Sequence, residues 1–166
     1  NANYAWILNI VSKLSENGVA GFLLANGALS GSGDEYKIRK KLIENNIVEA
    51  IAILPRNLFY TTDISVTLWI LNKNKSAHSA ELNGKIKKYR DRNNEILFMD
   101  LRQMGIPFEK KFTQFSNEDI DKITNTYHNW QQTSDEGKYQ NIPEFCYSAS
   151  IEEVAFKDYS LVPSKY

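Results

Sequence analysis

Two short apolar runs joined by a polar loop constrain the fold of this chain more than any other feature. Residues Ile47–Leu54 and Ser65–Leu71 are almost continuously apolar and rich in β-branched side chains, which is typical of strands buried on both faces. The ten residues between them are too few for a helical crossover, so the two strands should pair antiparallel. The loop presents two adjacent aromatic residues, Phe59 and Tyr60, which suits the binding of a flat ligand against a ring.

The residues before this pair predict a helix, a strand and a second helix. Apolar residues at helical spacing indicate a helix over Asn3–Leu14, and a short apolar run indicates a buried strand over Val19–Ala25. Ser32 and Glu35 stand in the relation of a capping box, so the second helix should run from about Gly33 to Asn45. This order of elements matches the last part of a mixed, mostly parallel sheet whose final strand is inserted antiparallel.

Beyond residue 72 the chain alternates polar segments with further regular elements. Three segments without apolar periodicity are expected to be surface loops or irregular, namely Asn72–Asn94, Arg102–Phe115 and Gln132–Gln140. The first of them contains the most basic cluster of the chain, Lys85–Arg92. The regular elements expected here are a strand over Glu95–Leu101, a helix opened by Ser116 and Asp119, and a short helix opened by Ser150 and Glu153.

The composition argues against several kinds of function. Basic and acidic residues number 20 each, so nucleic-acid binding gets no support from overall charge and would rest on local patches. The single cysteine, Cys146, excludes an internal disulfide and, with only two histidines, argues against a metal site. No apolar run approaches membrane-spanning length, so a cytoplasmic protein without membrane contact is expected. The chain begins in helical period at Asn1 rather than at a methionine, which indicates a segment of a longer protein.

Five blocks of sequence, taken in order along the chain, carry a resemblance to a known family. The blocks are NANYAWILNIVSKL, LANGALSGSGDEYKIRKKLIENNIVEAI, ILPRNLFYTTDISVTLWILNKNK, EILFMDLR and IPEFCYSASIEEVAFKDYSLVPSKY. They resemble the modification (M) subunit of type I restriction–modification systems. Members of that family are DNA adenine-N6 methyltransferases that use S-adenosylmethionine.

The resemblance implies an α/β fold that is the second half of a doubly wound, S-adenosylmethionine-dependent methyltransferase sheet, mostly parallel with a terminal antiparallel hairpin. In the family, the glycine-rich cofactor loop and the Asn-Pro-Pro-Phe/Tyr tetrapeptide lie upstream, and neither occurs in this chain. The chain therefore resembles only the C-terminal half of the catalytic domain. No catalytic, cofactor-binding or metal-binding residue is expected in it, and the chain alone is expected to be inactive.

The resemblance also implies an organisation and a set of partners. Residues 1–75 are expected to form the core, residues 76–94 a surface loop, and residues 95–166 an additional strand and helices. The implied partners are DNA, the specificity (S) and restriction (R) subunits and the missing N-terminal half, with S-adenosylmethionine as the cofactor of the full enzyme. An exposed edge on the Val19–Ala25 strand further predicts pairing with another chain, including a homo-oligomer.

Phe59 and Tyr60 are the leading site candidates. Methylation of an exocyclic amine requires the base to leave the helix and to be held between flat surfaces. In the family's motif order this loop lies where one face of the flipped adenine is stacked, so the resemblance implies that one of the two rings forms that wall. The alternative is that Phe59 packs beneath the loop as a core residue, and the sequence does not separate the two rings.

Four further residues are candidates for the rim that faces the adenine and the DNA. Asn26 and Gly27 follow the end of a strand, where ligands gather in open α/β sheets, although Asn-Gly is also a common turn dipeptide. Lys73 and Lys75 lie near the aromatic hairpin in sequence and are candidates for phosphate contact. The Lys85–Arg92 cluster is another candidate, although charge runs are usually solvated surface.

Two alternatives to the leading interpretation stay open. In the first, the chain is a non-catalytic truncated or interaction module that packs against another chain. In the second, it belongs to a different amino-methyltransferase that has the same sheet and acts on RNA or protein. The length of the resemblance to type I modification subunits favours the DNA enzyme over this second alternative.

Overall fold

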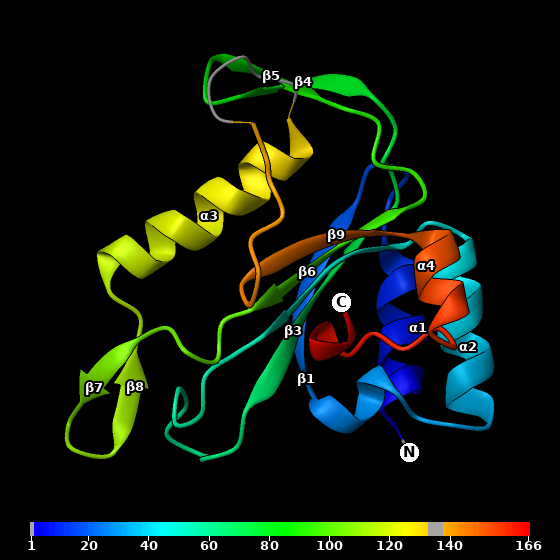
Figure 1. The fold of residues 1–166 in the computed structure, drawn as a ribbon. Coiled ribbons are helices and arrows are strands. Elements are labelled where there is room, and N and C mark those ends of the chain that lie inside the picture. Colours follow the sequence, from blue (N-terminus) through cyan, green and yellow to red (C-terminus); the bar gives the residue numbers. More distant parts are fainter. Residues whose placement is uncertain (1, 133–137) are drawn as a thin grey trace.

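The computed structural model describes residues 2–132 and 138–166, and within them a five-stranded sheet carries helices on both faces (Figure 1). From one edge to the other, the strands are β1 (Val19–Ala25), β3 (Val66–Asn72), β2 (Val48–Ile53), β6 (Glu95–Asp100) and β9 (Cys146–Ser150). The expected α/β class is therefore confirmed. The loop expected over Gln132–Gln140 falls mostly on residues 133–137, which lie outside the described residues. No helix in the described part of the chain is both long and apolar enough to cross a membrane.

The sheet is mostly antiparallel, so the expectation of a mostly parallel sheet is wrong. β2 and β6 pair in parallel, with Ala50 opposite Leu97, whereas the other three pairings are antiparallel. The cause is the position of β3, which lies between β1 and β2 and runs antiparallel to both. The predicted antiparallel pair is confirmed, since Ile51 on β2 lies opposite Trp69 on β3.

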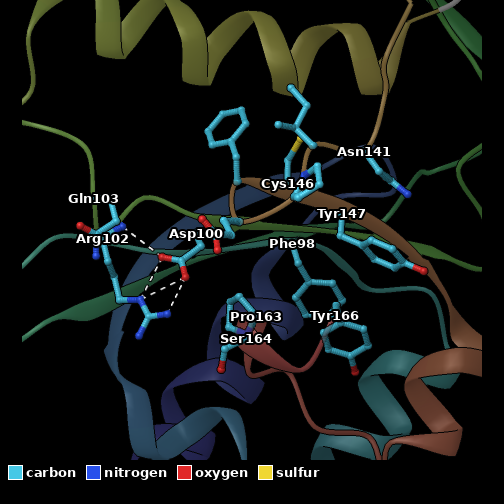
Figure 2. Close-up of a pocket in the computed structure, with 14 residues that line it drawn as sticks. Phe98, Asp100, Arg102, Gln103, Asn141, Cys146, Tyr147, Pro163, Ser164 and Tyr166 are labelled. Atoms are coloured by element: carbon cyan, nitrogen blue, oxygen red, sulfur yellow. Dashed lines mark hydrogen bonds and ion pairs between the residues drawn. The ribbon is translucent and has the colours of Figure 1, made fainter.

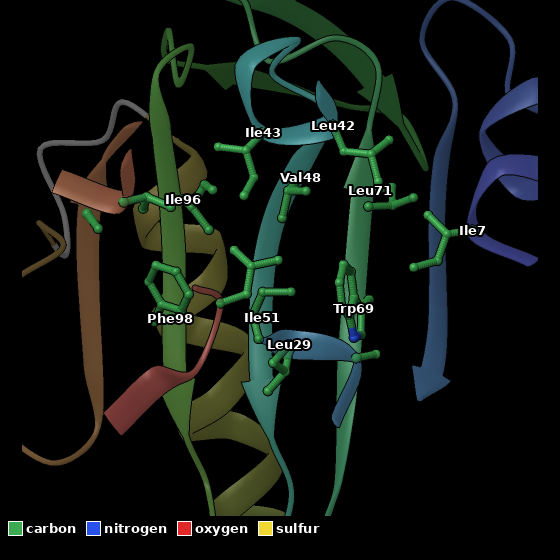
Figure 3. Close-up of a cluster of buried hydrophobic side chains, with 14 of the residues drawn as sticks. Ile7, Leu29, Leu42, Ile43, Val48, Ile51, Trp69, Leu71, Ile96 and Phe98 are labelled. Carbon is green, nitrogen blue, oxygen red and sulfur yellow. The ribbon is translucent and has the colours of Figure 1, made fainter. Parts of the chain in front are cut away.

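Three helices cover one face of the sheet and enclose the larger core (Figures 1 and 3). They are α1 (Asn3–Lys13), α2 (Asp34–Glu44) and α4 (Ile151–Phe156), accompanied by the 3-10 turns η1 (Asn26–Leu29) and η2 (Pro163–Lys165). Trp69 is fully buried at the centre of this core. Its ring stacks on Phe22 with 6.1 Å between ring centres and meets Tyr4 edge-on at 6.3 Å. Aromatic packing of this kind binds α1, β1 and β3 together.

One helix, α3 (Asn117–Gln131), packs over the second face of the sheet. Trp130 and Leu97 are fully buried in the smaller core beneath it. The helix begins as predicted, because Ser116 Oγ accepts a hydrogen bond from the Asp119 N–H at 3.1 Å and the Asp119 carboxylate accepts one from the Ser116 N–H at 2.9 Å. The two bonds satisfy amides that would otherwise lack partners at the helix terminus.

The start of α2 differs from the prediction. Its N-cap is Gly33, whose φ of 65° lies in the left-handed region that glycine adopts readily, and no side chain caps the helix. Ser32 is therefore outside the helix, and the capping box predicted with Glu35 is wrong. The Glu35 carboxylate instead lies against Gly31, where an added Cβ would stand 1.9 Å from Glu35 Oε2.

Two segments expected to be a loop and irregular chain form β-hairpins. β4 (His78–Leu82) and β5 (Lys85–Tyr89) are joined by Asn83 and Gly84, both with positive φ, as in a type I′ turn. β7 (Ile106–Phe108) and β8 (Phe112–Gln114) form the second hairpin. None of the residues in these four strands is buried, so the hairpins lack the long apolar runs that marked β2 and β3 as strands.

A buried polar cluster fastens the end of the β4–β5 segment to β2 and α3. Glu49 and Arg92 are both 0% exposed, and Arg92 Nε lies 3.0 Å from Glu49 Oε1. The other carboxylate oxygen of Glu49 accepts hydrogen bonds from the Tyr127 hydroxyl at 2.6 Å and from the Asn72 amide at 3.1 Å. Burial, aided by the Glu49 carboxylate, raises the pKa of Tyr127 and keeps its hydroxyl a donor. We call these four residues the Glu49 cluster.

Candidate functional site

The loop between β2 and β3 leaves the carboxyl end of β2 and has a tight turn at its tip. An antiparallel bridge pairs Phe59 with Thr62, so Tyr60 stands at the tip of the loop. The base of the loop is closed by the Ser65 hydroxyl, which donates to the Leu54 carbonyl at 2.5 Å. The loop is therefore closed by hydrogen bonds at its base and directly below its tip.

The two aromatic candidates have different surroundings. Phe59 is half-buried and packs against the smaller core, whereas the side chain of Tyr60 is 72% exposed. The Tyr60 ring is nearly perpendicular to the ring of Phe112 on β8, with 4.7 Å between ring centres and 84° between planes. Tyr60 is therefore the member of the pair whose ring surface is available to a ligand.

A hollow of about 300 Å³ lies between this loop and the β7–β8 hairpin. It is lined by Asn57, Phe59, Tyr60, Thr61, Thr62, Asp63, Lys111 and Phe112. The Thr113 N–H donates to the Asn57 carbonyl at 2.8 Å and so fixes β8 against the loop. A molecule bound in the hollow would contact aromatic rings and a lysine at the same time. Sequence reasoning missed the contribution of Phe112 and Lys111, because they lie about fifty residues further along the chain.

Asn26 and Gly27 lie at the same end of the strands as the aromatic loop. They follow β1, whose last residue, Ala25, lies opposite Val66 at the start of β3. Asn26 Oδ1 accepts a hydrogen bond from the Thr67 hydroxyl at 2.6 Å, so this side chain braces β3. Gly27 is exposed, with open space where a Cβ would point. The structure thus brings these two predicted residues to the end of the strands that carries Tyr60.

Lys73 and Lys75 lie at the opposite end of the strands. They follow the last residue of β3, whose seven residues separate them from the aromatic loop by roughly 20 Å. Lys73 is exposed and donates to the Leu14 carbonyl at 3.2 Å. Lys75 is only 2% exposed, and its ammonium donates to the carbonyls of Val48 at 3.0 Å and Glu95 at 2.6 Å. Neither lysine lies beside the loop, and the burial of Lys75 does not fit the rim contact predicted for it.

The buried ammonium of Lys75 predicts a distinctive pH dependence of stability. Burial lowers the pKa of Lys75 from 10.5 to about 8, although the Glu49 carboxylate favours the charged form. Between these two pH values the unfolded chain binds more protons than the folded chain, so this lysine makes stability rise with pH. We expect the free energy of unfolding of the wild type, minus that of Lys75→Met, to rise by about 1.4 kcal/mol per pH unit in that window.

Urea denaturation of both proteins between pH 8 and pH 10.5 measures this difference. The subtraction removes the contributions of the tyrosines that also titrate at alkaline pH. A difference that stays constant across the window would show that Lys75 titrates equally in the folded and unfolded chain.

A larger hollow, of about 640 Å³, lies at the carboxyl end of β6 (Figure 2). Phe98 and Tyr166 stack on one wall with 4.1 Å between ring centres, and Arg102 Nη2 lies 2.6 Å from Asp100 Oδ2 on another. Burial alone would raise the pKa of Asp100, but hydrogen bonds from Arg102 outweigh it and lower the pKa. Segments far apart in the sequence build these walls, so sequence reasoning did not find the hollow.

The comparisons with known proteins agree along the whole chain. The family model described as N-6 DNA Methylase matches residues 1–166. The chain belongs to the N-6 DNA methylase family. Its curated relatives include the type I restriction enzyme HindI methylase subunit of Haemophilus influenzae, which is 38% identical over 167 residues. The type I restriction enzyme MjaIX methylase subunit of Methanocaldococcus jannaschii is 34% identical over 166 residues. Both alignments cover 100% of this chain, and the predicted resemblance to type I modification subunits is confirmed.

Solved structures of type I subunits share the fold of this chain. The type I restriction-modification system methyltransferase subunit from Streptococcus thermophilus superposes with a TM-score of 0.80 and 26% identity, covering 100% of this chain and 30% of that one. The type I restriction enzyme EcoKI M protein gives a TM-score of 0.68 at 17% identity, covering 97% of this chain and 37% of that one, a likeness of fold alone. The chain spans 34% of the HindI subunit and 27% of the MjaIX subunit.

Proposed function

We propose that this chain is the C-terminal half of the catalytic domain of a type I methylase subunit, which transfers a methyl group from S-adenosylmethionine to adenine N6 in DNA. The match of the whole chain to about a third of such subunits supports the proposal. The observation that carries the site is the exposed ring of Tyr60, which stands beside a hollow at the carboxyl end of β2.

The proposed contribution of this chain is one wall of the pocket for the extruded adenine. An enzyme that modifies a base takes it out of the duplex stack and holds it against aromatic surfaces. Tyr60 supplies such a surface, and Phe112 and the hydrogen bond from Thr113 to Asn57 brace it from the side. Asn26 and Gly27 form the neighbouring rim of the sheet. Lys73 and Lys75 lie at the opposite end of the strands and form no part of this wall.

The segment after β1 does not form the cradle that a glycine-rich loop gives S-adenosylmethionine. Of the three glycines after β1, Gly27 belongs to η1 and Gly33 is the N-cap of α2, and both have open space beside them rather than a cradle. The third, Gly31, lies against the Glu35 carboxylate. The side-chain oxygen of Asn26 is already bonded to Thr67. Within residues 2–132 and 138–166, no group of three or more His, Cys, Asp and Glu side chains is placed to hold a metal ion. We assign the methyl donor to another segment of the enzyme.

The free edge of β1 supports the proposed partners. Val19 and Leu23 on β1 are 56% and 44% exposed, and among residues 2–132 and 138–166 β1 pairs with β3 on one side only. An exposed apolar edge strand is a template for pairing with another chain. We propose that the N-terminal half of the same domain covers it, and that DNA and the specificity and restriction subunits complete the assembly, which places the enzyme in the cytoplasm. The same edge favours the alternative of a non-catalytic module that packs against another chain or a second copy.

A chimaera separates these possibilities. We would replace the matching segment of the HindI methylase subunit with this chain and assemble it with its specificity subunit. We expect the assembly to form N6-methyladenine in duplex DNA, detected by mass spectrometry of the nucleosides. Calorimetry should detect no binding of S-adenosylmethionine to the isolated 166-residue chain.

Each other outcome contradicts a named part of the proposal. Micromolar binding of S-adenosylmethionine by the isolated chain would contradict the assignment of the methyl donor to another segment. An assembled chimaera that binds the cofactor without methylating DNA would favour the non-catalytic module. Methylation of RNA or protein in place of DNA would favour a different amino-methyltransferase.

A further inference from the structure

The β7–β8 hairpin has no assigned role, although it stands directly beside the proposed base pocket. Figure 1 shows that it projects from the body of the domain. Two contacts nevertheless fix it to the aromatic loop, namely the bond from the Thr113 N–H to the Asn57 carbonyl at 2.8 Å and the perpendicular contact of Phe112 with Tyr60. The hairpin and the loop therefore present one continuous surface.

The apolar side chains of this surface are unusually exposed. Phe108 lies opposite Phe112, and Ile106 lies opposite Gln114, so all four side chains share one face of the hairpin. Ile106 is 51% and Phe108 is 37% exposed, and Tyr60 continues the same surface. Adjacent exposed apolar side chains on a soluble domain mark an interaction site more often than single ones do.

The turn of the hairpin adds positive charge to this aromatic surface. Lys110 and Lys111 are exposed in the turn between β7 and β8, and Lys111 Nζ lies 5.7 Å from the centre of the Phe112 ring. The same turn carries one carboxylate, Glu109, which is also exposed, and the acidic side chain of the neighbouring loop, Asp63, is paired with Arg56 at 3.6 Å. In the described part of the chain, neither lysine forms an ion pair. The turn therefore carries a net charge of +1, and both of its ammonium groups can contact an anionic partner.

We propose that the β7–β8 hairpin is an arm that holds the DNA strand beside the extruded adenine. Lys110 and Lys111 bind phosphates of that strand, and the strand lies against the exposed ring of Phe108 and the half-buried ring of Phe112. Extrusion of a base unstacks its neighbours, and lysines interleaved with aromatic rings are the combination that binds unstacked single strands. The inference rests on the proposed function and extends it to residues that the family resemblance does not assign.

Removal of the two lysine charges tests the arm. In the chimaeric methylase assembled with its specificity subunit, we expect Lys110→Ala/Lys111→Ala to weaken binding to duplex DNA about tenfold. We expect the slope of log affinity against log salt to fall by about two, because two phosphate contacts are lost. Fluorescence anisotropy with labelled duplex, titrated at several salt concentrations, measures both quantities. The matched control is Lys37→Ala/Lys41→Ala on α2, which removes the same charge from the opposite face of the sheet and should leave both unchanged.

The outcomes distinguish a failure of the arm from a failure of the proposed function. If the wild-type assembly methylates adenine and the hairpin variant keeps its affinity and salt slope, the hairpin does not bind DNA and the proposed function stands. If the wild-type assembly methylates no adenine, the proposed function fails independently of the hairpin. If the variant no longer assembles with the specificity subunit in gel filtration, the hairpin contacts protein and not DNA. That result would overturn the proposal of a DNA-binding arm.

Discussion

Replacement of Arg92 with alanine should lower the free energy of unfolding by about 3–5 kcal/mol, one of the two largest effects that we expect. Arg92 is the cationic partner of Glu49, and both side chains are fully buried. Without Arg92, the carboxylate would keep hydrogen bonds from Tyr127 and Asn72 but would lose the charge paired with it. A buried charge without its partner is far more costly than either an intact pair or no charge. Urea denaturation followed by circular dichroism measures the loss.

Two control variants separate the lost ion pair from lost packing. Glu49→Leu/Arg92→Met removes both charges and keeps most of the volume, so it should cost much less than Arg92→Ala alone. Arg56→Ala removes the exposed pair with Asp63 and should change stability by less than about 1 kcal/mol. If Arg92→Ala costs no more than Arg56→Ala, the Glu49 cluster does not fasten the hairpin segment to the sheet.

Replacement of Tyr60 with alanine should lower kcat/KM for adenine methylation about 5- to 150-fold in the assembled chimaera, the second large effect. The range follows from the stacking of one base on an aromatic ring, which is worth about 1–3 kcal/mol. Tyr60→Phe keeps the ring and should retain most of the activity. The tip of the loop is exposed, so Tyr60→Ala should leave the free energy of unfolding nearly unchanged.

Phe59 is the matched comparison for Tyr60, because the two residues are adjacent aromatics in different surroundings. Phe59 packs against the smaller core, so Phe59→Ala should lower stability more than Tyr60→Ala does. Fluorescence of 2-aminopurine at the target position reports extrusion of the base in each variant. Reversed effects, with activity lost only in a stably folded Phe59→Ala, would transfer the stacking role to Phe59. Normal activity in both alanine variants would show that the loop is not part of the base pocket.

Local patterns in the sequence predicted most of the element order. The apolar runs at residues 47–54 and 65–71 became β2 and β3, and the short loop between them predicted their antiparallel pairing. The capping motif at Ser116 and Asp119 located the start of α3. Each of these signals acts over fewer than twenty residues, so no knowledge of the tertiary fold was needed.

The features that the sequence analysis missed depend on contacts between distant segments. Arg92 and Lys75 looked like surface cations because their partners, Glu49 and the carbonyl groups of β2 and β6, lie elsewhere in the chain. One signal was present, since Glu49 is a charged residue in an otherwise apolar buried strand and implies a buried partner. The roles of Phe112 and Lys111 at the hollow had no comparable signal.

β3 is hydrogen-bonded on both sides, so the aromatic loop leaves from one interior strand and returns to another. Its tip, at Tyr60 and Thr61, is exposed and lies outside the named strands of the sheet. Substitutions at the tip should therefore alter the proposed base-contact surface while the strands that carry it stay folded. A change in the proposed base contact therefore needs no compensating change in the sheet.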